Sequence, residues 1–295
     1  DTPPLDSATV VMLRDGAQGM EVLLLKRSAA SAVLGGAFVF PGGKLDAADA
    51  HPEVLQHLDR PLSALHARLG EAELPEGKAA SLFVAALREA FEESSVLFAQ
   101  AQAEHTQSLA QAREHLGQGM PFAQVLQGGA LTLQTEALVP WSRWITPRVP
   151  SVTNKRFDTR FFIAAIPRDQ VAVHDNHETT ESAWLSPRAA LQQYWNREIE
   201  LAPPQIMSLA HLSRHASVHS AMSEARQKQP PLVLPEPFDD NGERVLCYPG
   251  DPRHPVSARA LPGPTRLMWR NRRTFPCGIL ADQQLAADAA SHKFS

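Results

Sequence analysis

The stretch 85-AALREAFEESSVLFA-99 carries three glutamates within five residues, at Glu89, Glu92 and Glu93. Positions i, i+3 and i+4 share one face of a helix, so the three carboxylates would lie side by side. Their mutual repulsion costs helix stability unless cations lie between them. The ordinary interpretation is a solvated acidic face on which Arg88 pairs with Glu92.

A glycine-rich turn upstream favours metal chemistry instead. The apolar run 38-FVFPGGKLD-46 ends in Pro41-Gly42-Gly43, where the chain must turn sharply. A backbone carbonyl from such a turn and several carboxylates make an oxygen-only site that suits Mg²⁺ or Mn²⁺. Metal ions held in this way can bridge the oxygens of a diphosphate and offset the charge that develops as a P–O bond breaks.

Together these residues resemble the Nudix hydrolases, whose box is a Gly, five residues, a Glu, seven residues and R-E-U-x-E-E-x-G-U, with U aliphatic. The match begins at Gly43 and resumes at 88-REAFEESSV-96, after an insertion of about thirty residues. This interrupted box is similar to that of the peroxisomal coenzyme A diphosphatases of animals. The likeness spans roughly residues 8–225 and includes RFDTRFF (156–162), AWLSP (183–187) and EIELAPPQ (198–205).

The resemblance implies a role for each matching residue. Glu89, Glu92 and Glu93 would bind the metal, and Gly43 would contribute its carbonyl oxygen. One of the glutamates, with Glu89 and Glu93 as the candidates, would serve as general base. Arg88 would orient the acids by ion pairing.

A further carboxylate in this family usually comes from a loop before a late strand, some six residues ahead of a Trp. Glu178 stands six residues before Trp184, and Glu181 is the near alternative. An acid on a surface loop is the ordinary interpretation of either residue. Glu178 is the residue that the resemblance favours for catalysis.

The box departs from the family pattern at two positions. Its first Glu falls at Asp49, beside the insertion, so the sequence leaves the usual link to Arg88 open. Its closing Gly is Ser95, which we expect to be a tolerated replacement because Ser costs little in an α conformation. Neither departure removes a metal ligand.

Two arginines are candidates for substrate binding. Arg27 lies in LLLKRS (23–28), a partial likeness to a signature of another branch of coenzyme A diphosphatases, in which Lys26 is the alternative; Arg156 precedes the FDTRFF segment. A charged strand end and a strand-terminal ion pair are the respective alternatives. The tryptophans at 141, 144 and 184 are expected in the core, although one of them could stack on an adenine.

Two further patterns remain outside the box. His211, His215 and His219 recur at i, i+4 and i+8; we expect a partly exposed ridge, because no acid or Cys that would complete a zinc site is obvious. Residues 253–273 hold six arginines and no acid, which favours a solvated arginine-rich tail over a site for an anionic group of a ligand.

Strand and helix signals alternate along the chain. Strands are predicted at 8–13 and 21–26 as a hairpin, and at 138–147, 157–166 and 182–186; helices at 79–99, 186–195 and 205–225. With the resemblance, they predict an α/β fold, the Nudix α/β/α sandwich with a mixed β-sheet. A Nudix domain at 5–200, with a helical insertion at about 50–79, precedes a helical and irregular extension at 201–295.

Composition narrows the choice of partners. The 295 residues carry a net charge of -4, which gives no general pull toward nucleic acid or an anionic membrane. Only two cysteines occur, and no signal-peptide pattern or membrane-length apolar run is present, so a cytoplasmic location is expected. The sequence leaves open whether the chain forms a homodimer.

The predicted function is hydrolysis of a small-molecule diphosphate, with coenzyme A or an acyl-CoA as the leading substrate. NAD(H), ADP-ribose or a nucleotide sugar is the alternative within the same chemistry. A non-catalytic Nudix-fold binding module is the alternative outside it, although such proteins usually lose glutamates of the box and this chain keeps all three.

Overall fold

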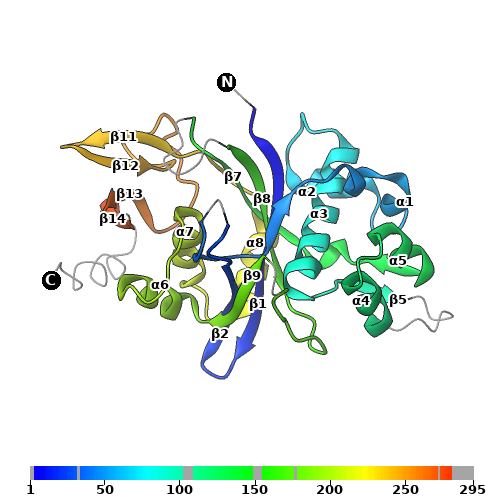
Figure 1. Cartoon of the computed structure of the whole chain (residues 1–295). Coiled ribbons are helices and arrows are strands. Elements are labelled where there is room, and N and C mark those ends of the chain that lie inside the picture. Colours follow the sequence, from blue (N-terminus) through cyan, green and yellow to red (C-terminus); the bar gives the residue numbers. More distant parts are fainter. Residues whose placement is uncertain are drawn as a thin grey trace.

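The computed structural model describes residues 3–31, 34–101, 109–148, 155–175, 178–271 and 273–280. An eight-stranded mixed sheet forms its centre (Figure 1). The strands are β1 (Leu5–Gly16), β2 (Gly19–Arg27), β3 (Phe38–Val39), β4 (Gly42–Lys44), β7 (Val139–Ile145), β8 (Phe157–Ala165), β9 (Thr179–Leu185) and β10 (Leu232–Val233). The main path runs β10-β7-β8-β1-β2-β3, with β4 paired to β1 and β9 to β2.

Strand β1 divides the molecule into two hydrophobic layers. Successive side chains of a strand point to opposite faces, and here Val10 and Met12 join one buried cluster while Val11 and Leu13 join the other. The predicted β1–β2 hairpin is confirmed, with Leu13 opposite Val22. β1 also runs parallel to β8, which places it inside the sheet and explains why both of its faces are apolar.

Helices cover both faces and confirm the predicted α/β/α sandwich (Figure 1). One face carries η1 (Ala47–Ala50), α1 (Pro52–Leu55), α2 (Leu62–Leu69), α3 (Glu76–Ser94), α4 (Leu109–Gly117) and α5 (Phe122–Gly128). The short strands β5 (Ala99–Ala101) and β6 (Leu131–Leu133) pair beside them, followed by η2 (Thr135–Ala137). The other face carries α6 (Pro187–Trp195), α7 (Pro203–Leu212) and α8 (Val218–Gln227).

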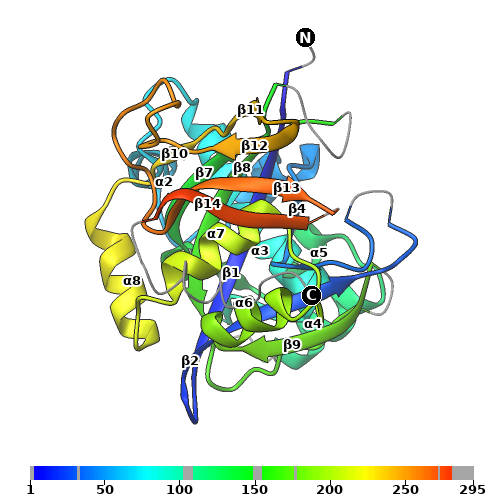
Figure 2. The ribbon, with the colours of Figure 1, turned by 90° about the vertical axis from the view of Figure 1, so that its left-hand side faces the viewer.

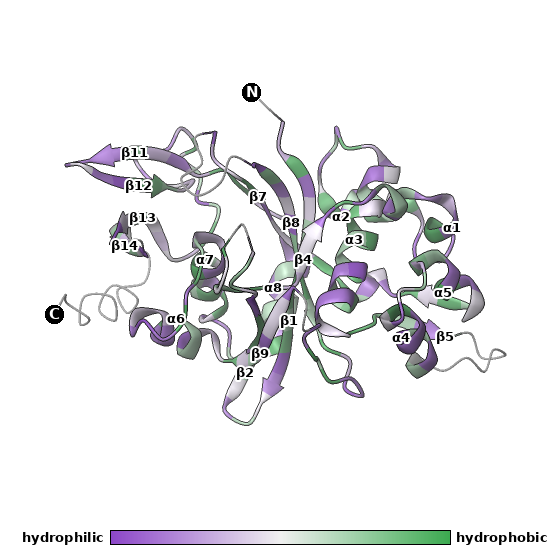
Figure 3. Cartoon of the chain, in the orientation of Figure 1, coloured by the Kyte–Doolittle hydropathy of each residue, from purple (hydrophilic) through white to green (hydrophobic). Residues whose placement is uncertain are grey.

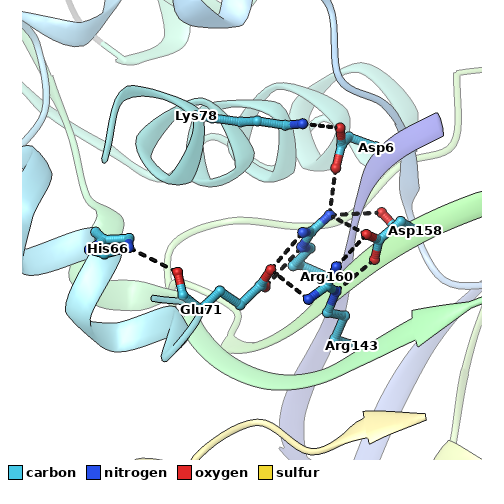
Figure 4. A network of polar contacts seen from close by, with 7 residues as sticks. All are labelled: Asp6, His66, Glu71, Lys78, Arg143, Asp158 and Arg160. Carbon is cyan, nitrogen blue, oxygen red and sulfur yellow. Dashed lines mark hydrogen bonds and ion pairs between the residues drawn. The ribbon is translucent and has the colours of Figure 1, made fainter. Parts of the chain in front are cut away.

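The insertion folds into helices, as predicted, and is fixed to the sheet by buried ion pairs. Glu71, between α2 and α3, pairs with Arg160 of β8 at 2.7 Å and with Arg143 of β7 at 2.9 Å. Arg160, 4% exposed, also pairs with Asp6 of β1 at 2.6 Å. Figure 4 shows the whole network, which adds Asp158, Lys78 and the His66 contact to the Glu71 carbonyl. Because Lys78 belongs to the first turn of α3, the network sets where that helix begins on the sheet.

Helix α3 ends earlier than predicted. It stops at Ser94, and Ser95 takes a left-handed conformation with φ 59° and ψ 18°. The expectation of an α conformation at Ser95 is therefore wrong. The apolar residues 96–98 led the prediction to extend the helix, but they pack into the core after the turn. Figure 3 shows α3 hydrophobic over most of its length, with hydrophilic residues near the end that carries the glutamates.

The extension contains more regular structure than predicted. The span 205–225 forms two helices rather than one, because the chain turns at 213–217. The following residues, predicted to be irregular, form an antiparallel sheet of β11 (Glu236–Asp240), β12 (Glu243–Cys247), β13 (Pro264–Arg270) and β14 (Arg273–Leu280). Figure 2 shows this sheet in front of α7. These strands were not predicted because they are short, half-buried and separated by proline-rich connections. The domain boundary near residue 200 stays a prediction.

The arginines of the extension are not a solvated tail. Arg266 pairs with the buried Asp251 at 2.7 Å, and Arg273 with Glu200 at 2.7 Å. Arg270 pairs with Glu243. The run holds no acid of its own, so its partners come from other segments that the sequence pattern could not assign. Arg272 lies outside the described residues.

Cys247 and Cys277 are both free thiols. Among the described residues, no helix is long and apolar enough to cross a bilayer.

Ser95→Gly should stabilise the protein by about 1 kcal/mol, because an L side chain in the left-handed region costs roughly that much and glycine pays no such cost. Chemical denaturation measures the change. Ser95→Ala keeps the β-carbon and is the matched control, for which no gain is expected. Equal stability of the glycine and alanine variants would contradict the account.

Arg160→Met should destabilise the protein by about 3 kcal/mol, because Asp6, Glu71 and Asp158 would keep buried charge without its partner. The matched control is Arg60→Met, which removes an exposed pair with Glu136 of 2.8 Å and should cost less than about 1 kcal/mol. Urea unfolding of both variants measures the change in the free energy of unfolding. Similar losses of stability in the two variants would show that the buried network does not anchor the insertion.

Candidate active site

The glutamates lie in the last two turns of α3, against the glycine turn that leads into β4. Glu93 is 4% exposed, and its Oε2 accepts a hydrogen bond of 2.9 Å from the Gly42 backbone N–H. The turn is held in place because Gly42 and Gly43 pair with Thr9 and Ala8 of β1. Helix and sheet therefore meet at this carboxylate.

Gly43 permits the approach of the second glutamate. A β-carbon at Gly43 would lie 2.3 Å from Glu89 Oε1, which is far inside contact distance. A larger residue at this position would push the Glu89 carboxylate away from the turn. The pattern PGG followed by glutamates on a helix has a direct structural basis here.

Arg88 holds the acids from the other side. Its Nε and Nη2 donate to the two carboxylate oxygens of Asp49 at 2.8 and 2.9 Å. Its Nη1 donates to Glu89 and Glu92, both at 2.8 Å, and Nη2 also reaches the Lys44 carbonyl at 3.1 Å. The link between Asp49 and Arg88, which the sequence left open, is therefore present.

The insertion does not disturb this link. Asp49 sits in η1, where its side chain accepts from the Asp46 N–H as part of a capping box. The inserted residues lie between η1 and α3. Asp49 therefore stays in contact with Arg88. Asp49 is 1% exposed, and its charge is balanced by the bidentate guanidinium.

Burial disfavours the ionised form of the two inner carboxylates, Glu89 and Glu93. Burial, together with the neighbouring Glu89 charge, raises the pKa of Glu93 to about 8, while the Gly42 hydrogen bond acts in the opposite direction. Burial likewise raises the pKa of Glu89 to about 7, although Arg88 acts in the opposite direction. A cation between them would remove this penalty, and an oxygen-only donor set fits a hard divalent ion.

The other predicted residues lie at different distances from this pair. The charges of Arg27 and Glu178 both act on the pKa of Glu93, so the structure brings them close to it. The two are joined through the sheet, because the Ser28 N–H donates to the Glu178 carbonyl at 2.8 Å. Glu181 instead pairs with Lys26 at 3.3 Å, which distinguishes it from Glu178.

Glu92 and Arg156 differ from the buried pair in their surroundings. The Glu92 side chain is 52% exposed and lies at the rim of the cluster. The backbone carbonyl of Arg156 accepts from Leu5, and its Nε donates to the Thr146 carbonyl at 3.1 Å. These contacts place Arg156 beside the first residue of β1, and its role in substrate binding stays a prediction.

The tryptophans behave as expected. Trp141 and Trp144 are buried, and Arg14 lies 4.4 Å over the ring of the partly buried Trp184. The contacts that sequence reasoning missed are backbone ones, the Gly42 N–H on Glu93 and the Lys44 carbonyl on Arg88. The glycine turn was their only signal.

Comparison with known proteins agrees with the geometry. Residues 6–212 match the family described as NUDT19 Nudix domain. The chain is 30% identical to the acyl-coenzyme A diphosphatase NUDT19 of Xenopus laevis over 232 residues, covering 68% of this chain and 61% of that protein. The human protein of the same name is 30% identical over 238 residues, with coverages of 68% and 63%.

A solved structure supports the same conclusion. The NUDIX hydrolase from Alicyclobacillus acidocaldarius has a TM-score of 0.60 and 27% identity, covering 75% of this chain and 96% of that one. The chain therefore belongs to the Nudix hydrolases, in the NUDT19 Nudix domain family. It spans about three fifths of the length of the two curated relatives.

Glu93→Gln should stabilise the metal-free protein at alkaline pH. Between its unfolded value of 4.5 and its folded value of about 8, the raised pKa of Glu93 means that the folded state holds a proton which the unfolded chain has released. Stability therefore falls as pH rises through this window, and glutamine removes that part of the fall.

The measurement is Tm in EDTA at stepped pH. The difference between Glu93→Gln and the wild type should grow as the pH rises. Glu181→Gln, at an exposed position, is the control and should follow the wild type. Parallel curves for Glu93→Gln and the wild type would contradict a buried, proton-retaining carboxylate.

Proposed function

We propose that the protein is a metal-dependent diphosphatase that acts on coenzyme A or an acyl-CoA. The observation that carries the proposal is the pair of buried carboxylates, Glu89 and Glu93, held against the glycine turn with raised pKa values although Arg88 pairs with Glu89. The substrate class is supported by the relatives in Xenopus laevis and human, which are named acyl-coenzyme A diphosphatases.

Glu89 and Glu93 are the inner metal ligands in this proposal. Glu92 at the rim and the carbonyl of Gly43 complete the set, which suits Mg²⁺ or Mn²⁺ because all donors are oxygen. When bound, the ion would offset the charge that develops on the diphosphate oxygens. Arg88 is a positioning residue, since it reaches the glutamates and is itself fixed by Asp49.

The chain's own groups supply the remaining steps. A carboxylate among Glu89, Glu93 and Glu178 takes the proton from the attacking water. Arg27 is placed to meet a substrate phosphate. Its Nε is buried and lacks a hydrogen-bond partner within the described part of the chain.

The reaction consumes one water. Its oxygen bonds to a phosphorus of the diphosphate, the P–O bond to the bridging oxygen breaks, and the leaving phosphate carries away the bridging oxygen. With coenzyme A the products are 3′,5′-ADP and a phosphopantetheine. We place this activity in the cytoplasm, on a small molecule, without nucleic acid or membrane as partner, and leave dimer formation to direct measurement.

Mass spectrometry of products from a diphosphate panel tests the proposal. With Mg²⁺ or Mn²⁺ the protein should cleave coenzyme A or an acyl-CoA with a higher kcat/KM than NADH, ADP-ribose or a nucleotide sugar. Glu93→Gln should reduce kcat by at least about 100-fold, because it removes a metal-binding charge from the reaction centre. If all these substrates stay intact with the wild type, the protein is not a diphosphatase of this kind.

A matched pair of variants assigns the loop carboxylate within the same assay. Glu178→Gln should lower kcat by more than about tenfold, whereas Glu181→Gln should stay within about twofold because Glu181 pairs with Lys26. The reverse order would make Glu181 the functional residue.

A further inference from the structure

A second group of metal-type ligands lies on the opposite layer of the molecule, at the junction of α7 and α8. Ligand atoms of His211, His215 and Glu224 all lie within 4.8 Å of one another. His211 Nε2 is 3.4 Å from Glu224 Oε1, and His215 Nε2 is 2.8 Å from Glu224 Oε2. The diphosphatase chemistry uses none of these residues.

The spacing fits one small transition-metal ion. Tetrahedral Zn²⁺ holds nitrogen and oxygen ligands at about 2.0–2.1 Å, which places neighbouring ligand atoms roughly 3.3 Å apart. The two measured separations lie on either side of this value. Three protein ligands with two imidazoles and one carboxylate leave a fourth position for water.

Both imidazoles are oriented by other groups. His211 stacks on Trp141 of β7 with ring centroids 5.0 Å apart and 27° between the planes. His215 Nδ1 is 2.9 Å from Ser220 Oγ, which turns Nε2 toward Glu224. The contact to Nδ1 of His215 is of the kind that orients histidine ligands in metal sites. Nδ1 of His211 is buried and has no hydrogen-bond partner in the described part of the chain, so the ring of His211 is held by stacking. Burial lowers the pKa of His211 to about 4, so this imidazole is neutral at neutral pH and can donate its lone pair.

The turn between the two helices creates the site. Along a single helix, His219 would continue the ridge of His211 and His215. The break at 213–217 instead brings Glu224 of α8 against them, and leaves His219 beside Ser223. This is why the sequence showed no acid near the histidines. Lys228 pairs with Glu224 but is 66% exposed, so a cation of higher charge can displace it.

We propose that His211, His215 and Glu224 form a binding site for Zn²⁺ or a similar transition-metal ion that joins α7 to α8. The site is distinct in chemistry from the glutamate cluster, because imidazole nitrogen selects Zn²⁺ or Co²⁺ while the oxygen-only cluster suits Mg²⁺. Its role is structural: the ion links two helices that lie against the sheet, and Trp141 reports on it optically.

The test uses Glu93→Gln protein from which bound metal has been removed, and titrates it with Zn²⁺ and then with Co²⁺. The substitution and an excess of Mg²⁺ in the buffer prevent the carboxylate cluster from contributing to the binding of the added ion. We expect one Zn²⁺ per chain by calorimetry, a higher Tm, a tetrahedral Co²⁺ absorption band and partial quenching of the tryptophan fluorescence by Co²⁺, because Trp141 stacks on His211. The result does not depend on diphosphatase activity, so the two proposals can fail separately.

His215→Gln and Glu224→Gln should each weaken Zn²⁺ binding by at least about tenfold. His219→Gln is the matched control and should bind like its parent, while Lys228→Met should bind more tightly because the competing cation is gone. Circular dichroism of the metal-free variants checks that each is folded. Parental affinity in both ligand variants, or no Zn²⁺ binding by the parent, would overturn the proposal.

Discussion

The structure depends on burying carboxylates at the contact between α3 and the glycine turn. Glu93 is almost fully buried and meets the backbone N–H of Gly42, while Glu89 lies against the bare α-carbon of Gly43. Burial raises the pKa of both side chains, even though Arg88 pairs with Glu89 and the Gly42 N–H donates to Glu93. In the proposed function, a bound divalent cation would offset this electrostatic cost.

The surrounding fold keeps those carboxylates in register. Arg88 fixes their orientation, Asp49 fixes Arg88, and the η1 turn fixes Asp49. At the other end of α3, the ion pairs around Arg160 fix the insertion and the helix start to β1 and β8. The helix is thus held at both ends, so an inserted segment of helices can interrupt the motif without moving its functional groups.

Periodicity and glycine placement predicted the parts of the molecule that rest on local rules. The β1–β2 hairpin follows from two short apolar runs on either side of a turn. The glutamates were predicted together because i, i+3 and i+4 share a helix face. The backbone angle of Ser95 was mispredicted, because the following apolar residues looked like more helix.

Interactions between distant segments could not be predicted in the same way. The partners of Arg266 and Arg273 lie outside the run of residues 253–273, so the run, which holds no acid itself, looked solvated. Glu224 meets two histidines only because the chain turns between α7 and α8. The second sheet consists of short strands between proline-rich connections. The pairing of these strands depends on a surface that α6 and α7 provide.

The central claim is that Glu89 and Glu93 are held as a divalent-cation site that retains protons when empty. Calorimetry of Mn²⁺ binding at neutral pH, in buffers of different ionisation enthalpy, measures both the affinity and the protons released. The account predicts that binding releases protons, that the release diminishes as pH rises past the folded pKa values, and that Glu93→Gln weakens binding strongly. Mn²⁺ binding of equal affinity in Glu93→Gln, or binding without proton release, would contradict it.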